Sequence, residues 1–172
     1  MGLGLVNGLP AHILLVHVVV VLAPLAALAL IVCACFPRAA RRAGLALPVL
    51  ALAVLVGVPL TTHTGEWLEH HVERDPLIRR HTELGDGLLP WVLGLFVLAT
   101  AVWWAQRRAS ATPPAPAAAG WARSAPLRAV AVVLALLIGA GTLVQVYRIG
   151  DSGARAAWHD GFSATARQGQ RR

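Results

Sequence analysis

Four long apolar segments dominate the chain. Their approximate limits are Leu9 to Phe36, Leu45 to Trp67, Leu84 to Ala105 and Leu127 to Arg148. A membrane-spanning helix needs about 20 consecutive, mostly apolar residues, and each segment is close to that length. The pattern therefore predicts an all-α, polytopic membrane protein. We expect one domain over residues 1–162, a bundle of four transmembrane helices. An Ala/Pro-rich cytoplasmic linker would cover residues 109–126 and a polar tail residues 163–172.

The composition indicates that lipid, not a large internal core, covers this apolar surface. Hydrophobic residues make up 57% of the 172 residues and charged residues only 13%, whereas a soluble domain has about one quarter charged residues. All 15 basic residues are arginine, and alanine is abundant. This codon bias is typical of a GC-rich bacterial genome, so we expect the inner membrane of a bacterial cell and the lipid bilayer as the main partner.

The arginines predict the orientation. Two segments that connect spans carry arginine and no acid, and these arginines are Arg38, Arg41, Arg42, Arg107, Arg108, Arg123 and Arg128. All eight acids lie on the opposite side, where they balance the remaining arginines. Because short arginine-rich loops stay in the cytoplasm, both termini should be extracytoplasmic. The net charge of +7 is then a topology signal, and no nucleic-acid partner is expected.

A helix start precedes the third span. Asp75 followed by Pro76 is a strong combination, because Asp caps a helix and Pro suits its first turn. We therefore expect the third helix to begin outside the bilayer and to form an extracytoplasmic helical hairpin extension with the end of the second. Gly85, Gly87 and Pro90 should loosen or kink the third helix where it enters the lipid.

The histidines provide the lead to function. All seven fall on the predicted outer side or in the outer half of a span. His17 lies about two turns inside the first span, where an ionisable residue normally faces the bundle interior and marks function. His12 is nearer the interface and about 140° from His17 around the helix, so the two should not bind one ion together. The alternative is that each is a neutral histidine satisfied by a hydrogen bond.

Other histidines lie in the segment between the second and third spans. His63, Glu66 and His70 share one face of the second helix, and histidine with carboxylate at this spacing can hold a divalent metal. The same residues are also typical of a solvated helix end. His81 shares a stripe of leucines that includes Leu84, so it should point inward and needs a hydrogen-bond partner or a ligand.

Several of these residues fall within longer motifs. The segment from Pro10 to His17, with two histidines five residues apart, is one. Thr62 to Trp67, His81 before the third span, and Gly150 to Ala154 are the others. Together they make the chain similar to the DUF2231 family of bacterial membrane proteins, over nearly all four spans.

The resemblance implies the four-helix fold and singles out His12, His17 and His81, but it implies no activity. Many members have Pro after the first histidine and Phe-Pro after the second. This chain has Ile13, and Val18 with Val19, at those places. We therefore expect its first helix to be less kinked.

Our preferred hypothesis is a b-type haem or a metal near the outer face, between the first three spans. Histidines on facing helices can bind haem iron from both sides, for electron transfer or redox sensing with a redox partner. We expect His17 and His81 as ligands, with His63 or His12 as the alternate. A divalent metal on His63, Glu66 and His70 is a further alternative. The chain has no Cys-x-x-Cys-His motif, which excludes covalent haem attachment through it.

The competing hypothesis is a non-catalytic scaffold or partner subunit, including a homo-oligomer, whose histidines are structural or sense pH. A small transporter fits less well, because the spans have few polar groups besides Thr142 and Gln145 of the fourth. No nucleophile triad, phosphate-binding loop or dinucleotide fingerprint is present, so an enzyme is not expected. If His17 faces lipid, the haem hypothesis should give way to structural histidines.

The orientation can be tested with cysteines placed at Ser110 and Ser163, after Cys33 and Cys35 are replaced by alanine. An impermeant thiol reagent should label position 163 but not position 110 in intact cells, and both after lysis. Labelling of position 110 but not 163 in intact cells would reverse the assignment.

Overall fold

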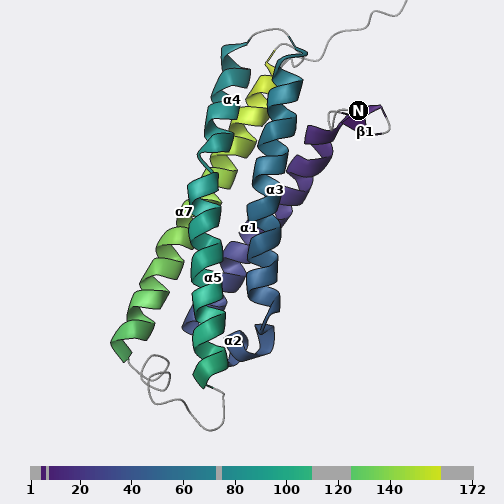
Figure 1. Ribbon diagram of the computed structural model, residues 1–172. Coiled ribbons are helices and arrows are strands. Elements are labelled where there is room, and N and C mark those ends of the chain that lie inside the picture. The colour runs from purple at the N-terminus through teal and green to yellow at the C-terminus, as the bar shows by residue number, and fades with distance from the viewer. Residues whose placement is uncertain (1–4, 7, 73–74, 110–124, 160–172) are drawn as a thin grey trace, which may run out of the picture.

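The computed structural model describes residues 5–6, 8–72, 75–109 and 125–159 (Figure 1). The helices of this part of the chain are α1 (Ala11–Cys35), α2 (Pro37–Ala43), α3 (Ala46–Glu69), α4 (Pro76–Asp86), α5 (Leu89–Ala109) and α7 (Ala125–Trp158). A two-stranded antiparallel sheet of β1 (Leu5–Val6) and β2 (Leu9–Pro10) precedes α1. Neither α2 nor this small sheet was expected from the sequence.

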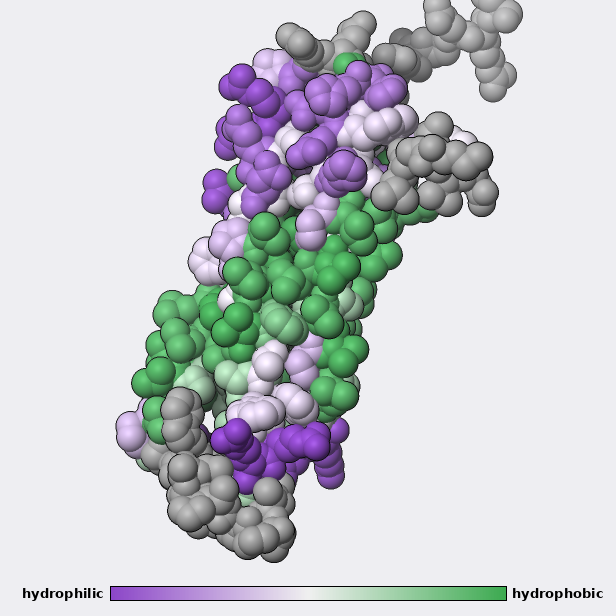
Figure 2. All heavy atoms as spheres, in the orientation of Figure 1, coloured by the Kyte–Doolittle hydropathy of each residue, from purple (hydrophilic) through white to green (hydrophobic). Residues whose placement is uncertain are grey.

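Four helical segments are long and apolar enough to cross a membrane. They are α1, α3, α4 together with α5, and α7. On the face shown in Figure 2, apolar residues form a belt across the middle of the molecule, and hydrophilic residues gather at both ends. The prediction of an all-α protein with four apolar spans is therefore confirmed.

The two ends of the bundle differ. The start of α1, the end of α3, the whole of α4 and the end of α7 lie together, and we call this the α4 end (Figure 1). The α2 end carries α2, the end of α5 and the start of α7. The start of α1 and the end of α7 therefore lie at the same end of the bundle, as an even number of spans requires.

Small residues let the helices approach closely. α1 packs on both α3 and α7, and Ala23, Ala26 and Ala27 of α1 are fully buried. On α7, a Cβ added to Gly139 would lie 2.6 Å from Cδ1 of Ile31. Between membrane helices the hydrophobic effect supplies little attraction, so close packing over small residues has to hold the bundle together.

The third span is broken where the sequence indicated. α4 ends at Asp86 and α5 begins at Leu89, and the amide of Leu88 bonds to the carbonyl of Gly85 at 3.0 Å, a tightened turn. Gly87 has no side chain at the point where Gln145 of α7 approaches. A Cβ added to Gly87 would lie 2.9 Å from Nε2 of Gln145. Pro90 lacks an amide hydrogen. The expected kink is thus present.

α4 begins as predicted but packs differently. The side chain of Asp75 accepts a hydrogen bond from the amide of Leu77 at 2.7 Å, and Pro76 occupies the first turn. The Asp75 carboxylate also pairs with Nε2 of His159, 3.3 Å away. Beyond this cap, α4 packs chiefly along α7 rather than along the end of α3.

Close packing around Gly141 gives a stability prediction. A Cβ at Gly141 would lie 1.9 Å from the Trp91 ring, whereas nothing lies within 4 Å at Gly150 on the same helix. Gly141→Ala should therefore lower the free energy of unfolding by about 1–3 kcal/mol, because the ring must move. Gly150→Ala should leave it unchanged or raise it by up to about 1 kcal/mol.

Thermal unfolding of both variants in the same detergent measures the difference. A Gly141→Ala protein as stable as the wild type would show that the close packing of α5 on α7 does not limit stability.

Candidate functional site

Two histidines distant in sequence meet at the α4 end. His12 lies in the first turn of α1, and His81 lies in the middle of α4. Their ring centroids are 6.3 Å apart and the ring planes are inclined by 86°. Both side chains are partly buried. This pair is the centre of the candidate site.

His12 is fixed by α3. Its Nδ1 lies 2.9 Å from the carbonyl oxygen of Thr61. A Cβ on Gly65, one turn further along α3, would come within 3.0 Å of the imidazole. The lack of a side chain at Gly65 therefore makes room for the ring, and the Thr61 carbonyl sets its orientation.

His81 is fixed by α7 in the same manner. Its Nδ1 lies 3.1 Å from the carbonyl oxygen of Ile149 and 3.0 Å from Oγ of Ser152. The Ser152 hydroxyl itself donates to the Ile149 carbonyl at 2.9 Å. A Cβ on Gly153 would lie 2.9 Å from Cε1 of His81. Glycine again makes room for an imidazole, and a backbone carbonyl orients it.

These partners determine the tautomers. A carbonyl oxygen can only accept a hydrogen bond, so Nδ1 of His12 and Nδ1 of His81 must each carry the proton. In the neutral ring the lone pair then resides on Nε2. Histidines that bind metals commonly donate the other ring N–H to a carbonyl or carboxylate in this way.

His81 favours the neutral form. It belongs to α4, and this helix lies at the hydrophilic end of the molecule (Figures 1 and 2). Burial lowers the pKa of His81 because it penalises the charged ring, and the neighbouring His12 lowers it further. The hydrogen bond to Ile149 acts in the opposite direction. Neutral imidazole is the form that can ligate a metal.

Polar bonds around the pair tie the elements of this end together. Nε2 of Gln145 on α7 donates to the carbonyl of Leu84 on α4 at 2.7 Å. The hydroxyl of Thr82 on α4 donates to Glu69 of α3 at 3.1 Å. Within the described residues, no buried side-chain nitrogen or oxygen lacks a partner. The α4 end is therefore a satisfied polar cap on an apolar bundle.

His17 does not face the bundle interior, and that prediction was wrong. Its side chain is exposed, and its Nδ1 bonds to the carbonyl of Ile13 in its own helix. The buried face of α1 runs through Val19 and Ala23. His12 is seven residues before Val19 and therefore shares this face. His17 lies about 160° from Val19 around the helix.

The structure does not gather the other histidines into one cluster. His63 and Glu66 lie 3.9 Å apart, with side chains 73% and 58% exposed, and His70 is also exposed. In the described ranges, no group of three or more His, Cys, Asp and Glu side chains is placed to hold a metal ion. The shared helix face of these three residues thus has the geometry of a solvated helix end.

Sequence analysis missed most of the residues that fix the pair. Ser152, Gly65 and Gly153 had appeared only as members of longer motifs. The periodicity of a single helix does not show which carbonyl or glycine of another helix meets a ring. The one usable signal was that Gly65 and Gly153 lie in two of the motifs that carry the family resemblance, as His12 and His81 lie in two others.

The comparisons with known proteins identify the family. A family model described as a predicted membrane protein family, DUF2231, matches residues 8–166. The chain belongs to the DUF2231 family. The matched range begins just before α1 and continues past the end of α7, so it contains His12, His81 and every residue that fixes them. No curated protein and no solved structure matches the chain significantly.

For this DUF2231 protein, loss of His81 should release α4 from α7. Each hydrogen bond is worth about 0.5–1.5 kcal/mol, so His81→Ala should raise local opening of α4 by about threefold or more. Limited trypsin digestion at Arg79 and Arg80 measures this opening, because a protease cuts only the undocked helix.

The matched control is His71→Ala, which removes an exposed imidazole stacked on Trp67 with ring centroids 4.1 Å apart. It should leave the cleavage rate within α4 unchanged. Equal rates in both variants and the wild type would contradict the role assigned to His81.

Proposed function

We propose that this protein binds a metal centre through Nε2 of His12 and Nε2 of His81, at the α4 end of the bundle. One observation carries the proposal. Two imidazoles from different helices meet with ring centroids 6.3 Å apart, and each has its Nδ1 committed to a backbone carbonyl. This arrangement leaves both Nε2 atoms for a ligand.

The separation of the rings suits one shared metal. Two imidazoles that bind one ion through nitrogens at about 2.0–2.1 Å hold their ring centres roughly 5 to 6.5 Å apart. The observed 6.3 Å lies within this range, so His12 and His81 could both hold one metal or haem iron, which would supply redox chemistry when bound.

The donor set also favours haem over a bare ion. In the described part of the chain, no third His, Cys, Asp or Glu joins the pair to hold an ion. A haem iron needs only two protein ligands, because the porphyrin supplies the other four nitrogens. Imidazole also suits copper and zinc, which would have to complete their coordination with water or backbone oxygen.

This proposal differs from the one that the sequence suggested. The exposed position of His17 meets the condition set in the sequence analysis for abandoning haem binding by His17 and His81, so that pair is given up. The present proposal rests only on the contact between His12 and His81. His12 takes the place of His17, and it was one of the two alternates. His63 is exposed and is not part of the proposed pair.

The proposed role depends on orientation. The arginine-rich connections predict that the α2 end is cytoplasmic, so we propose that both termini and the helical extension formed by α4 are extracytoplasmic. Bound iron or copper would supply one-electron chemistry, and the two histidines that hold it would tune its potential. His12 and His81 would then hold a centre for electron transfer or redox sensing on the outer side of the membrane.

A second function is favoured by a specific observation. Each Nδ1 already joins two helices, and no buried polar side-chain atom of the described residues is left over. The same histidines can therefore act as interhelical braces in a non-catalytic scaffold or partner subunit. In that case the free Nε2 atoms need only water.

Absorption spectra of the purified protein, oxidised and reduced, distinguish these functions, together with metal analysis. We expect a Soret band that shifts on reduction, or about one bound transition metal per chain. His12→Ala and His81→Ala should each abolish the band or the metal.

His17→Ala is the matched control, because it removes a histidine of α1 that is exposed. It should leave the spectrum and the metal content unchanged. A wild-type protein purified from its native membrane with neither chromophore nor metal would refute the metal centre and leave the scaffold. Retention of either one in the His12→Ala and His81→Ala double variant would refute the assigned ligands.

A further inference from the structure

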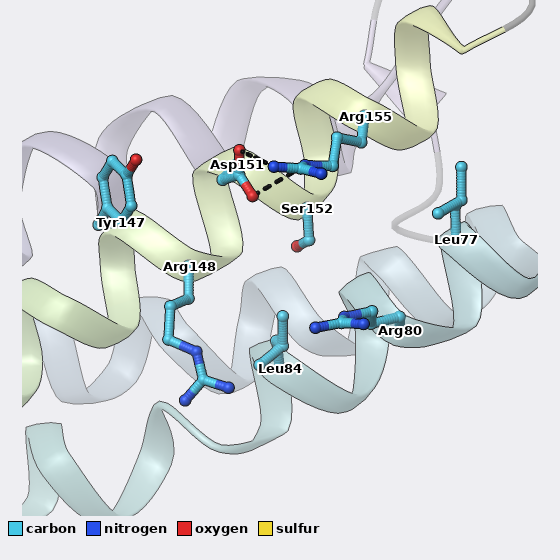
Figure 3. A pocket seen from close by; sticks show the side chains of 8 residues that line it. All are labelled: Leu77, Arg80, Leu84, Tyr147, Arg148, Asp151, Ser152 and Arg155. Carbon is cyan, nitrogen blue, oxygen red and sulfur yellow. Dashed lines mark hydrogen bonds and ion pairs between the residues drawn. The ribbon is translucent and has the colours of Figure 1, made fainter.

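A cavity of about 250 Å³ lies between α4 and α7, separate from the two rings of the histidine pair. Its walls are formed by Leu77, Arg80, Leu84, Tyr147, Arg148, Asp151, Ser152 and Arg155. Figure 3 shows that these side chains come from α4 and α7, with Arg148 and Ser152 of α7 directed toward α4. The volume is below the roughly 300–1,000 Å³ of pockets for drug-sized molecules, so it suits a smaller group.

The charge of the cavity is unbalanced. The guanidinium of Arg155 donates two hydrogen bonds, of 3.0 and 3.2 Å, to the carboxylate of Asp151. The charges of these two side chains therefore cancel. Arg80 of α4 and Arg148 of α7 remain, and both extend into the space beside Leu84 (Figure 3). The cavity therefore presents two cationic groups in excess of its one carboxylate.

Nearby arginines of α4 are arranged differently. Arg79, next to Arg80, is paired with Glu83 on its own helix at 3.4 Å. Arg80 and Arg148 are exposed and line the cavity from two helices whose contact is fixed by the bonds of His81 and Gln145. Figure 3 shows their side chains on either side of Leu84. Two like charges that line one cavity favour an anion there.

From this geometry we infer that the cavity is a binding site for a phosphate group, held between the guanidinium groups of Arg80 and Arg148. Guanidinium groups bind phosphate oxygens with paired, charge-assisted hydrogen bonds. The Ser152 hydroxyl at the back of the cavity is already committed to Ile149, so the arginines supply the recognition.

The position of the cavity favours an esterified phosphate, as in the headgroup of an anionic phospholipid. The polar α4 end meets the apolar belt here (Figure 2). The lining includes the side chain of Leu84 and the exposed ring of Tyr147. Aromatic side chains and arginines at this depth commonly contact headgroups. Free inorganic phosphate shares the same chemistry and is distinguished in the test.

The full-length protein in detergent is titrated with short-chain phosphatidylglycerol, and hydrogen–deuterium exchange is followed in α4 and in residues 147–155. We expect lipid to slow exchange in both segments. In the Arg80→Gln/Arg148→Gln variant, the lipid concentration for half-maximal protection should rise about tenfold or more.

The matched control is Arg41→Gln/Arg42→Gln, which removes the same charge at the α2 end. It should leave protection of α4 and residues 147–155 unchanged. Inorganic phosphate in place of the lipid identifies the source. Protection at comparable concentrations indicates free phosphate as the ligand, and protection by the lipid alone indicates a headgroup.

Two results would overturn the inference. One is the absence of local protection by either compound in the wild type. The other is an equal response of the wild type and the Arg80→Gln/Arg148→Gln variant, provided that both show the same exchange in α4 without ligand. If the Arg80→Gln/Arg148→Gln variant exchanges faster in α4 without ligand, it is replaced by Arg80→Lys/Arg148→Lys. The lysines keep the positive charge but lack the paired donors of the guanidinium group, so protection by the ligand should weaken as well.

Discussion

A lipid bilayer offers no hydrogen bonds, and this constraint governs the rest of the molecule. Every backbone amide within the hydrocarbon has to be satisfied inside its own helix, so four long helices form. Polar side chains at membrane depth face the same requirement. The described part of the protein meets it completely, since no buried side-chain nitrogen or oxygen lacks a partner. Hydroxyls such as that of Thr142 bond back to their own helix at 2.8 Å, whereas hydrophilic residues gather at the two ends of the bundle.

Close approach of helices and polar bonding depend on each other at that end. Gly65 and Gly153 have no side chain, which brings the backbones of α3 and α7 near to the rings of His12 and His81. The carbonyls of those backbones then become the acceptors for the rings. The break at Gly87 lets α4 lean on α7 and exposes the Leu84 carbonyl to Gln145. A rigid pair of imidazoles results, with Nδ1 occupied on both. Preorganisation of this kind serves a metal centre, and it serves equally to brace helices that have little hydrophobic reason to associate.

Much of the candidate site was within reach of the sequence, but not its pairing. The inward position of His81 followed from its leucine stripe, and the separation of His12 from His17 followed from their spacing of five residues. Which of these two faces the bundle depends on the rotation of α1. An ionisable residue two turns inside a span suggested His17, because depth was the only information available. In the structure, Nδ1 of His17 forms a hydrogen bond with the carbonyl of Ile13 in its own helix. The depth of His17 in the span therefore does not require an inward position.

The sequence by itself determined the class of protein, the number of spans and the place where α4 starts. These follow from local physics, namely the length of apolar runs, the capping by Asp75 and the backbone chemistry of Gly87 and Pro90. Only the tertiary structure decided that α4 lies chiefly on α7, that His12 meets His81, and that Arg80 and Arg148 share a cavity. Those outcomes depend on how each helix is rotated and tilted against its neighbours. Side-chain packing across the whole bundle sets these angles, and the periodicity of one helix contains no record of them.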